Sequence, residues 1–227
     1  MDMPEPRTLA DLPYVGHLEE HDGAELRRDE DHDVVHFDDR AFTGFEAGNS
    51  RFTECAFSAS RLTDGSLRRA RFNDTWLHGV QVVGTDLAET TWLDAEFVSS
   101  ALAGAEAFDA RLTRVAFFGC KLVSVNLRGA VLRDVVFVDS VLRDVDFSGA
   151  AITGASFPGS VLDDVRFDQA RLADVDFRAA SALSLHDGHG SLRGATISPD
   201  QALELAPALA RALGIAVSDR PGHERLP

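Results

Sequence analysis

Apolar residues recur at every fifth position from residue 37 to residue 177, all of them large except Ala47 and Ala107, and no insertion breaks the series. The stretch VLRDVVFVDSVLRDVDFSGA, residues 131–150, shows the spacing at Leu132, Phe137, Leu142 and Phe147. A helix requires apolar spacings of three and four, and a half-buried strand requires a spacing of two, so neither explains the pattern. A fixed repeat dictates the architecture of the whole segment, and it has to be interpreted before any local secondary structure.

A second period of twenty residues is superimposed on the first. One series consists mostly of phenylalanine and the next mostly of leucine: Phe37, Phe57, Leu77, Phe97, Phe117, Phe137, Phe157 and Phe177, then Phe42, Leu62, Val82, Leu102, Leu122, Leu142 and Leu162. This segregation indicates that residues twenty apart touch, so that four pentapeptides make one coil. At a strand spacing of about 4.8 Å, roughly eight coils make a rod of about 35–40 Å. A single coil cannot bury its apolar residues alone, so stacked neighbours supply the core.

Two positions after each large residue stand turn formers, among them Gly44, Asn49, Asp64, Asp74 and Gly84. These residue types tolerate the tight corners that a four-sided coil requires. The repeated pattern, seen as ADVDF and VNLRG, resembles the pentapeptide-repeat family over about residues 35–197. The resemblance implies an all-β solenoid, a right-handed quadrilateral β-helix, which we predict for residues 35–197 with an irregular part at 181–190.

Residues 198–227 follow a different pattern, which predicts a short C-terminal helix followed by a short strand and a tail. Ser198 suits the N-cap, Pro199 the first helical position and Gly214 the end. Pro207 lies inside and should kink or split the helix. The segment resembles the C-terminal element of the Qnr and MfpA group of quinolone-resistance proteins. That resemblance implies a homodimer, whose apolar contacts would come from Leu205, Leu209, Leu213, Ile215 and Val217.

Residues 1–34 lack the five-residue period and carry 11 acids against 3 arginines. We expect this acidic extension to be loosely ordered or docked on the coil. Within it, LADLPYVGHL (9–18) has enough apolar residues to dock on another surface.

No catalytic motif emerges from the chain, which is expected to be non-enzymatic and to need no cofactor. His186 and His189 of HDGHG, and the acidic run at 29–33, are better explained as a loop and a solvated stretch than as metal ligands. Cys55 and Cys120 both occupy the inward position for small residues, in coils about 15 Å apart. They are therefore expected to be core residues without a disulfide.

The net charge of −15 argues against direct binding of nucleic acid, because phosphates are bound by cationic side chains. No apolar run is long enough for a membrane span, and the N-terminus does not resemble a signal peptide, so a cytoplasmic location is expected. The charge permits a basic partner instead. The Qnr and MfpA resemblance implies DNA gyrase or topoisomerase IV, whose DNA-binding saddle an acidic rod would occupy and so protect from poisons.

Two columns of acids on the predicted coil are candidates for that contact. The first, Glu46, Asp86, Glu106 and Asp146, stacks at one outward position with no arginine column apparent beside it. The second runs along an edge and comprises Glu54, Asp74, Asp94, Asp134 and Asp174. Arg51, Arg71, Arg111 and Arg171 run beside the second column. Ion pairs within a face and turn hydrogen bonds are the alternative interpretation of both columns.

Outward positions of the phenylalanine-rich face form an apolar patch: Trp76, Val98, Phe118, Val136 and Val138. An exposed patch of this kind usually marks a binding surface. The patch supports an alternative function, a scaffold for an unrelated partner protein, unless residues 9–18 of this chain cover it.

Overall fold

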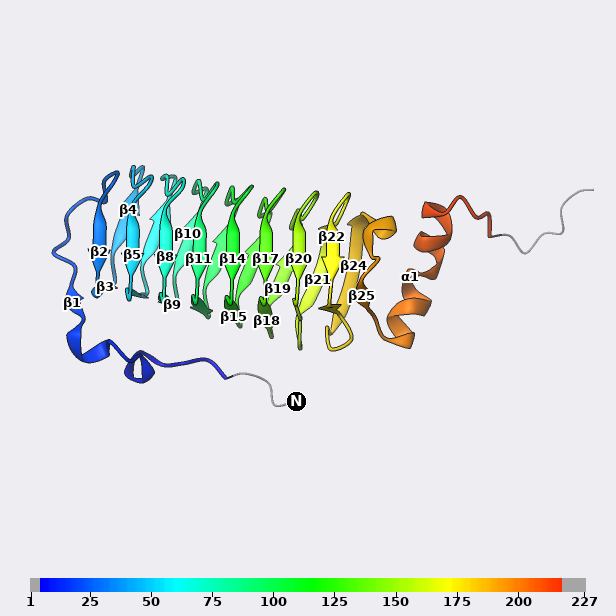
Figure 1. Cartoon of the computed structure of the whole chain (residues 1–227), viewed down its shortest axis with the longest axis horizontal. Coiled ribbons are helices and arrows are strands. Elements are labelled where there is room, and N and C mark those ends of the chain that lie inside the picture. The colour runs from blue at the N-terminus through cyan, green and yellow to red at the C-terminus, as the bar shows by residue number, and fades with distance from the viewer. Residues whose placement is uncertain (1–4, 218–227) are drawn as a thin grey trace, which may run out of the picture.

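The structure is a computed structural model that describes residues 5–217, and it is a straight β-solenoid of about nine turns with one helix at its C-terminal end (Figure 1). Parallel strands from successive coils stack along the rod axis, and each coil has four sides. The all-β solenoid predicted from the five-residue period is therefore confirmed. None of the helices in the described part is long and apolar enough to cross a membrane.

Three of the four faces are parallel sheets. The first face contains β1 (Glu19–Glu20), β3 (Val35–Asp38), β6 (Ala56–Ser58), β9 (Trp76–His78), β12 (Glu96–Val98), β15 (Ala116–Phe118) and β18 (Val136–Val138). The second contains β4 (Ala41–Thr43), β7 (Arg61–Thr63), β10 (Gln81–Val83), β13 (Ala101–Ala103), β16 (Lys121–Val123), β19 (Val141–Arg143), β21 (Val161–Arg166) and β24 (Ala182–Asp187). The fourth contains β2 (Asp31–Asp33), β5 (Arg51–Thr53), β8 (Arg71–Asn73), β11 (Thr91–Leu93), β14 (Arg111–Thr113), β17 (Val131–Arg133), β20 (Ala151–Thr153) and β22 (Arg171–Ala173). The third face is joined by single bridges, from Glu46–Ser66 to Asp146–Arg166.

The core consists of ladders of like side chains twenty residues apart. Phe97 pairs with Phe117 and Phe117 with Phe137, and both pairs of rings are stacked with centroids 4.7 Å apart. On the fourth face, Phe72 stacks on Trp92 at 3.7 Å. The inward positions are buried along the whole series. The twenty-residue coil inferred from the sequence thus has the correct register.

The corners explain why aspartate, asparagine and glycine recur two positions after each large residue. These residues adopt left-handed backbone conformations, such as φ 53° at Asp134 and φ 69° at Gly154. Such angles strain most side chains, but glycine, asparagine and aspartate tolerate them. A Cβ atom at Gly154 would also lie 2.6 Å from Oδ1 of Asp134, so the glycine leaves room for the aspartate of the preceding coil.

The segment at 181–190 is part of the solenoid, although the sequence register fails there. Strand β24 pairs with β21, but Leu162 is opposite Leu183, a separation of 21 residues. One extra residue therefore moves Leu183 into the buried position and leaves Ala182 exposed. The chain then passes through η3 (His189–Ser191) and β25 (Ala195–Thr196), which pairs with β23 (Val175–Asp176).

The described residues of the N-terminal extension, 5–34, lie docked on the coil, the second of the two alternatives expected for this segment. Strand β1 pairs with β3 and β2 with β5, so the parallel pairing of the solenoid begins before residue 35. His32 continues the ladder of the fourth face and stacks on Phe52 at 4.8 Å. His21 stacks on Phe37 at 4.5 Å, and together these rings cover the N-terminal end of the core. Before them lie η1 (Leu9–Asp11) and η2 (Val15–His17).

Helix α1 (Pro199–Ala212) covers the opposite end of the core. The Ser198 hydroxyl accepts a hydrogen bond from Gln201 N, and Gln201 Nε2 donates to the carbonyl of Phe177 at 2.8 Å. Helix α1 is continuous through Pro207, so of the two expected effects of this proline, a kink or a split, the split does not occur. Residues 215–217 form no strand in the described part, and the predicted tail at 218–227 lies outside the described residues.

Candidate functional site

The first acidic column lies on the third face, and its members are largely neutralised. Arg28 Nε lies 3.5 Å from Glu46, Arg68 Nε 2.9 Å from Asp86, and Arg128 Nε 2.7 Å from Asp146. Asp146 also has only 13% of its side chain exposed. Glu106 differs, since its partner is the neutral amide of Asn126 at 2.6 Å. The expectation that no arginine column faces these acids is wrong, because arginines of the preceding coil, each 18 residues before its acid, reach three of the four.

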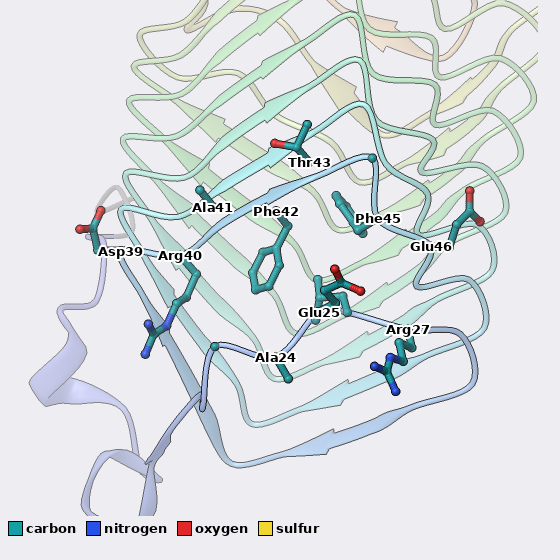
Figure 2. Close-up of a pocket in the computed structure, with 13 residues that line it drawn as sticks. Ala24, Glu25, Arg27, Asp39, Arg40, Ala41, Phe42, Thr43, Phe45 and Glu46 are labelled. Carbon is teal, nitrogen blue, oxygen red and sulfur yellow. The ribbon is translucent and has the colours of Figure 1, made fainter.

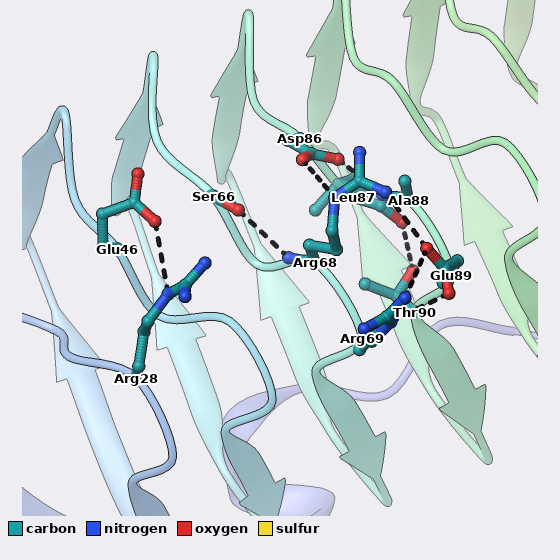
Figure 3. Close-up of polar contacts among 10 residues, drawn as sticks. All are labelled: Arg28, Glu46, Ser66, Arg68, Arg69, Asp86, Leu87, Ala88, Glu89 and Thr90. Atoms are coloured by element: carbon teal, nitrogen blue, oxygen red, sulfur yellow. Dashed lines mark hydrogen bonds and ion pairs between the residues drawn. The ribbon is translucent and has the colours of Figure 1, made fainter.

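Figure 3 shows how these contacts extend beyond single pairs. Arg68 bonds to Asp86 and also to Glu89, 3.1 Å away, and Arg69 bonds to Glu89 at 2.9 Å. The hydrogen bond from Arg69 lowers the pKa of Glu89, and the contact with Arg68 lowers it further. Asp86 and Glu89 are therefore parts of an internal ion-pair network and not free anions.

The second acidic column lies on the corner between the fourth and first faces. All five members are in the left-handed conformation, with φ between 47° and 53° at Glu54, Asp74, Asp134 and Asp174 and 56° at Asp94. Arg114 occupies the same column and binds Asp94 through two hydrogen bonds of 2.6 and 2.7 Å, which lower the pKa of that aspartate. Asp74 lies 3.8 Å from Arg7.

The other three members of the corner column have no ion pair within residues 5–217: Glu54, Asp134 and Asp174. The arginines expected to pair with this column lie at the other side of the fourth face instead. Arg51, Arg71 and Arg111 line an open groove beside Asp29, Glu89 and Asp109. The corner column is therefore only partly neutralised.

The apolar patch of the first face is not exposed, and the prediction of an open patch is wrong. Trp76, Val98, Phe118 and Val138 are buried, and Val136 is partly buried. Leu12 and Tyr14 of the N-terminal extension pack on them, as the docking alternative anticipated. Figure 1 shows the N-terminal segment running along this side of the rod. The sequence did not indicate the polar contacts that accompany the packing, in which Arg7 binds Glu96.

The residues expected to form a dimer contact divide into two groups. Leu205 is 5% exposed and belongs to the solenoid core, and Leu209 packs partly against it. Leu205 is therefore part of the end cap and not of a free surface. Leu213 (74% exposed), Ile215 and Val217 are exposed, and so is Leu203, which the sequence analysis did not single out.

The described residues contain no candidate metal centre, although Glu20, His36 and Ser58 form a hydrogen-bonded chain on the first face, with His36 Nδ1 3.1 Å from Glu20 and His36 Nε2 2.9 Å from Ser58. Within residues 5–217, no group of three or more His, Cys, Asp or Glu is placed to hold a metal ion. Cys55 and Cys120 are buried and free, and burial raises the pKa of their thiols to about 12 and about 11. A cavity of about 670 Å³ opens at the N-terminal end between residues 23–27 and 39–46, where Phe42 and Phe45 lie beside mixed charges (Figure 2).

Comparisons with known proteins identify the repeat. A family model described as "Pentapeptide repeat region" matches residues 90–167, and one described as "Pentapeptide repeats (8 copies)" matches residues 50–88. Together they span more than half of the chain. No curated protein matches the sequence.

Solved structures of pentapeptide-repeat proteins are also similar to this chain. Full-length QnrB1, a plasmid-mediated fluoroquinolone resistance protein, is 20% identical with a TM-score of 0.33, over 88% of this chain and 99% of that one. HetL, a pentapeptide repeat protein involved in heterocyst differentiation regulation from the cyanobacterium Nostoc sp. strain PCC 7120, is 18% identical with a TM-score of 0.28, over 74% and 83%. A thylakoid-lumen pentapeptide repeat protein from Arabidopsis thaliana is 20% identical with a TM-score of 0.27, over 55% and 73%.

Proposed function

Because this chain belongs to the pentapeptide-repeat family, we propose that it is a non-catalytic acidic rod that mimics DNA. In this proposal it binds the basic DNA-binding surface of a type II topoisomerase, DNA gyrase or topoisomerase IV, and protects the enzyme from poisons. It acts as a homodimer joined through the C-terminal helix.

The observation that carries the proposal is the negative charge of a straight, narrow rod. Nine turns at about 4.8 Å make a length of about 43 Å. Residues 35–179 of the coil carry 21 acids against 15 lysines and arginines, a net charge of −6, which is about one charge per 7 Å, against one per roughly 1.7 Å of duplex DNA. The coil alone therefore has about a quarter of the linear charge density of the duplex that it would replace, and the 11 acids of residues 1–34 add to the field that steers a basic partner into contact.

The corner column is the best candidate for the contact. Asp134 and Asp174 are exposed and Glu54 is partly exposed, and none of the three has an ion pair among the described residues. The third-face column is a weaker candidate, since breaking its arginine pairs would offset what a new partner contributes. Glu106 is the exception there, because only an amide binds it.

The exposed apolar residues of the C-terminal end support the homodimer. Leu203, Leu213, Ile215 and Val217 have no neighbour within the described chain that covers them. The alternative function, a scaffold that uses an open apolar patch, has lost the observation that suggested it, because that patch is buried.

The test is DNA supercoiling by gyrase with and without a fluoroquinolone, together with direct binding at about 50 mM salt, where charge contacts are weakly screened. We expect the wild-type protein to bind and to restore supercoiling in the presence of the drug. We expect Glu54→Gln with Asp134→Asn and Asp174→Asn to weaken binding and to flatten its dependence on salt.

A matched control removes three charges elsewhere, by Glu25→Gln, Asp38→Asn and Glu204→Gln. Each variant removes three negative charges, so the two have the same net charge. The three control residues are exposed, so their replacement should leave the fold intact. If the two variants weaken binding equally, the corner is not the contact surface. If the wild-type protein does not bind gyrase or topoisomerase IV at low salt, the proposed function is wrong.

A further inference from the structure

The N-terminal segment over the first face, residues 5–18, forms a strap with its own small core. Leu12 and Tyr14 are fully buried, and Leu9 and Leu18 are partly buried. On the solenoid side they contact the outward side chains of five successive strands: Ala56, Trp76, Val98, Phe118 and Val138. These contacts form a cluster separate from the ladders inside the solenoid. The interior is therefore complete without the strap.

Hydrogen bonds between the strap and the solenoid, several of them to main-chain groups, also hold the strap in place. The amide N–H of Arg7 donates to Glu96 Oε1 at 2.6 Å, and Trp76 Nε1–H donates to the carbonyl of Arg7 at 3.1 Å. The Tyr14 hydroxyl donates to the carbonyl of Asp74 at 2.9 Å. The solenoid face thus binds both the N–H and the C=O of one residue of the strap, as a peptide-binding groove binds main-chain groups.

One charged pair gives this face a chemical preference. Arg7 Nε donates to Glu96 Oε2 at 2.7 Å, and Glu96 is only 7% exposed in the middle of apolar neighbours. A carboxylate buried in such a strip is costly unless a cation binds it. Any segment that replaces the strap must therefore present a cationic side chain, and arginine suits a carboxylate best because it can form two parallel hydrogen bonds.

We propose that the outward side of the first face is a peptide-binding groove, that the strap is its internal competitor, and that a partner protein displaces the strap. The partner presents a segment with arginine, apolar residues two and five positions later, and tyrosine seven positions later, folded with a 3-10 turn after the arginine, as Arg7, Leu9, Leu12 and Tyr14 are. This surface adjoins the acidic corner column at Asp74, which Arg7 and Tyr14 contact, but the inference does not depend on the proposed binding to a topoisomerase.

Covalent attachment gives the strap an advantage over a free segment. A short tether raises its effective concentration to about the millimolar range. A partner segment consequently binds the wild-type chain more weakly than it binds a chain whose strap has been loosened. The groove is closed at rest and opens to a partner of higher affinity or higher local concentration.

The experiment uses the full-length chain and a fluorescent peptide of residues 5–18. Leu12→Asp loosens the strap from within, and the wild-type chain is the reference. We expect the peptide to bind the Leu12→Asp chain at least roughly tenfold more tightly than the wild type, because the internal competitor is weakened. Binding should also change the emission of Trp76, which lies under the strap.

A charge exchange tests the specificity. Adding Glu96→Lys to Leu12→Asp should abolish binding of the natural peptide and restore binding of a peptide with Arg7→Glu. Equal binding of both peptides to both chains would overturn the proposal. So would the absence of peptide binding at about 1 mM, the effective concentration of the tethered strap. If the loosened chain instead dimerises by exchanging straps and ignores the free peptide, the occupant is a second copy, and the partner proposal is wrong.

Hydrogen exchange of the wild-type chain tests the same proposal without a substitution. We expect the amides of the strap, such as Val15, to exchange much faster than those of β12 and β15 beneath it, because the strap opens while the solenoid remains closed. If the strap and the solenoid exchange at the same rate, they unfold together, and the groove cannot be vacated.

Discussion

At the scale of the residue, the ring ladders concentrate packing energy in a few side chains. Phe117 stacks between Phe97 and Phe137 with centroid distances of 4.7 Å on both sides, and it is buried. Each ring contacts neighbours in its own coil and in the two adjacent coils. A gap in such a ladder is difficult to fill, because the coils on both sides are held at a fixed spacing by backbone hydrogen bonds.

We expect Phe117→Ala to lower the free energy of unfolding by about 3–5 kcal/mol, as for other buried aromatic residues. Lys121→Ala, four residues along on the exposed side of β16, should change it by less than about 0.5 kcal/mol. Urea unfolding followed by circular dichroism measures both. A loss below about 1 kcal/mol for Phe117→Ala would contradict the ladder, since large-to-small changes in packed cores cost more.

The two histidines that cover the N-terminal end of the core make this end sensitive to pH. Burial lowers the pKa of His21 below 6.5, and Arg40 lowers it further, while Asp22 and Glu30 oppose the shift. Burial likewise lowers the pKa of His32, His21 adds to the effect, and Glu30, Asp31 and Asp22 oppose it. Both histidines are therefore neutral in the folded state at neutral pH.

The unfolded chain takes up protons near pH 6.5, the ordinary histidine value, before the folded chain does. The stability of the N-terminal end should consequently be complete above pH 6.5 and decrease as the pH falls through the lowered values. We expect His32→Phe to extend the ladder over Phe52 and to reduce this dependence. Hydrogen exchange of β2 and β5 between pH 5 and 7.5 measures it, and an unchanged slope in the variant would contradict the assignment to His32.

At the scale of the element, the strands and their register could be predicted from the sequence, but the contacts between columns could not. Phe117 follows from the period alone, since every coil imposes the same inward position. The partners of Glu46 and Asp146 depend on how far the flexible side chains of Arg28 and Arg128 extend across neighbouring coils. The period does not specify that reach. His32 could have been assigned to the core by extending the twenty-residue series of the fourth face from Phe52 back to residue 32.

The roles of the apolar residues at the C-terminal end could not be predicted from the sequence either, because some of them cap the core and others are exposed. Leu205 covers the open end of the last coil, whereas Leu213 and Ile215 beyond it are exposed. The sequence shows an apolar face but not where the solenoid ends beneath it. Only the structure separates the residues that cap the core from those left for a partner.

We expect Leu213→Asp with Ile215→Asp to convert the proposed homodimer into a folded monomer, because the two charges would have to be buried at the contact. Multi-angle light scattering measures the mass, and circular dichroism shows whether the fold is intact. Leu205→Asp is the contrasting variant and should destabilise the end of the solenoid instead. A wild-type protein that is already monomeric at about 100 μM, a concentration far above the Kd of a specific dimer, would show that the helix has another role.

At the scale of the whole molecule, the excess of acids has opposite consequences for stability and for binding. The chain carries 37 acids against 22 basic residues, so like charges repel one another along the rod. The exposed ion pairs offset little of this repulsion, since such pairs contribute about 0–1 kcal/mol each. The same field attracts a basic partner. Screening by salt should therefore relieve the repulsion within the rod and weaken the attraction to the partner.

We expect the melting temperature to rise and the affinity for gyrase to fall as sodium chloride increases. The relevant range is about 20 to 500 mM, over which the screening length decreases from roughly 20 Å to roughly 4 Å. Scanning calorimetry and equilibrium binding measure the two quantities in the same buffers. Sodium chloride is suited to this comparison because sulfate would strengthen apolar burial independently of charge.

A melting temperature that falls with salt would mean that the arginine pairs of the third face outweigh the repulsion. An affinity that does not change with salt would mean that any contact with gyrase depends on shape and apolar packing instead of on DNA-like charge.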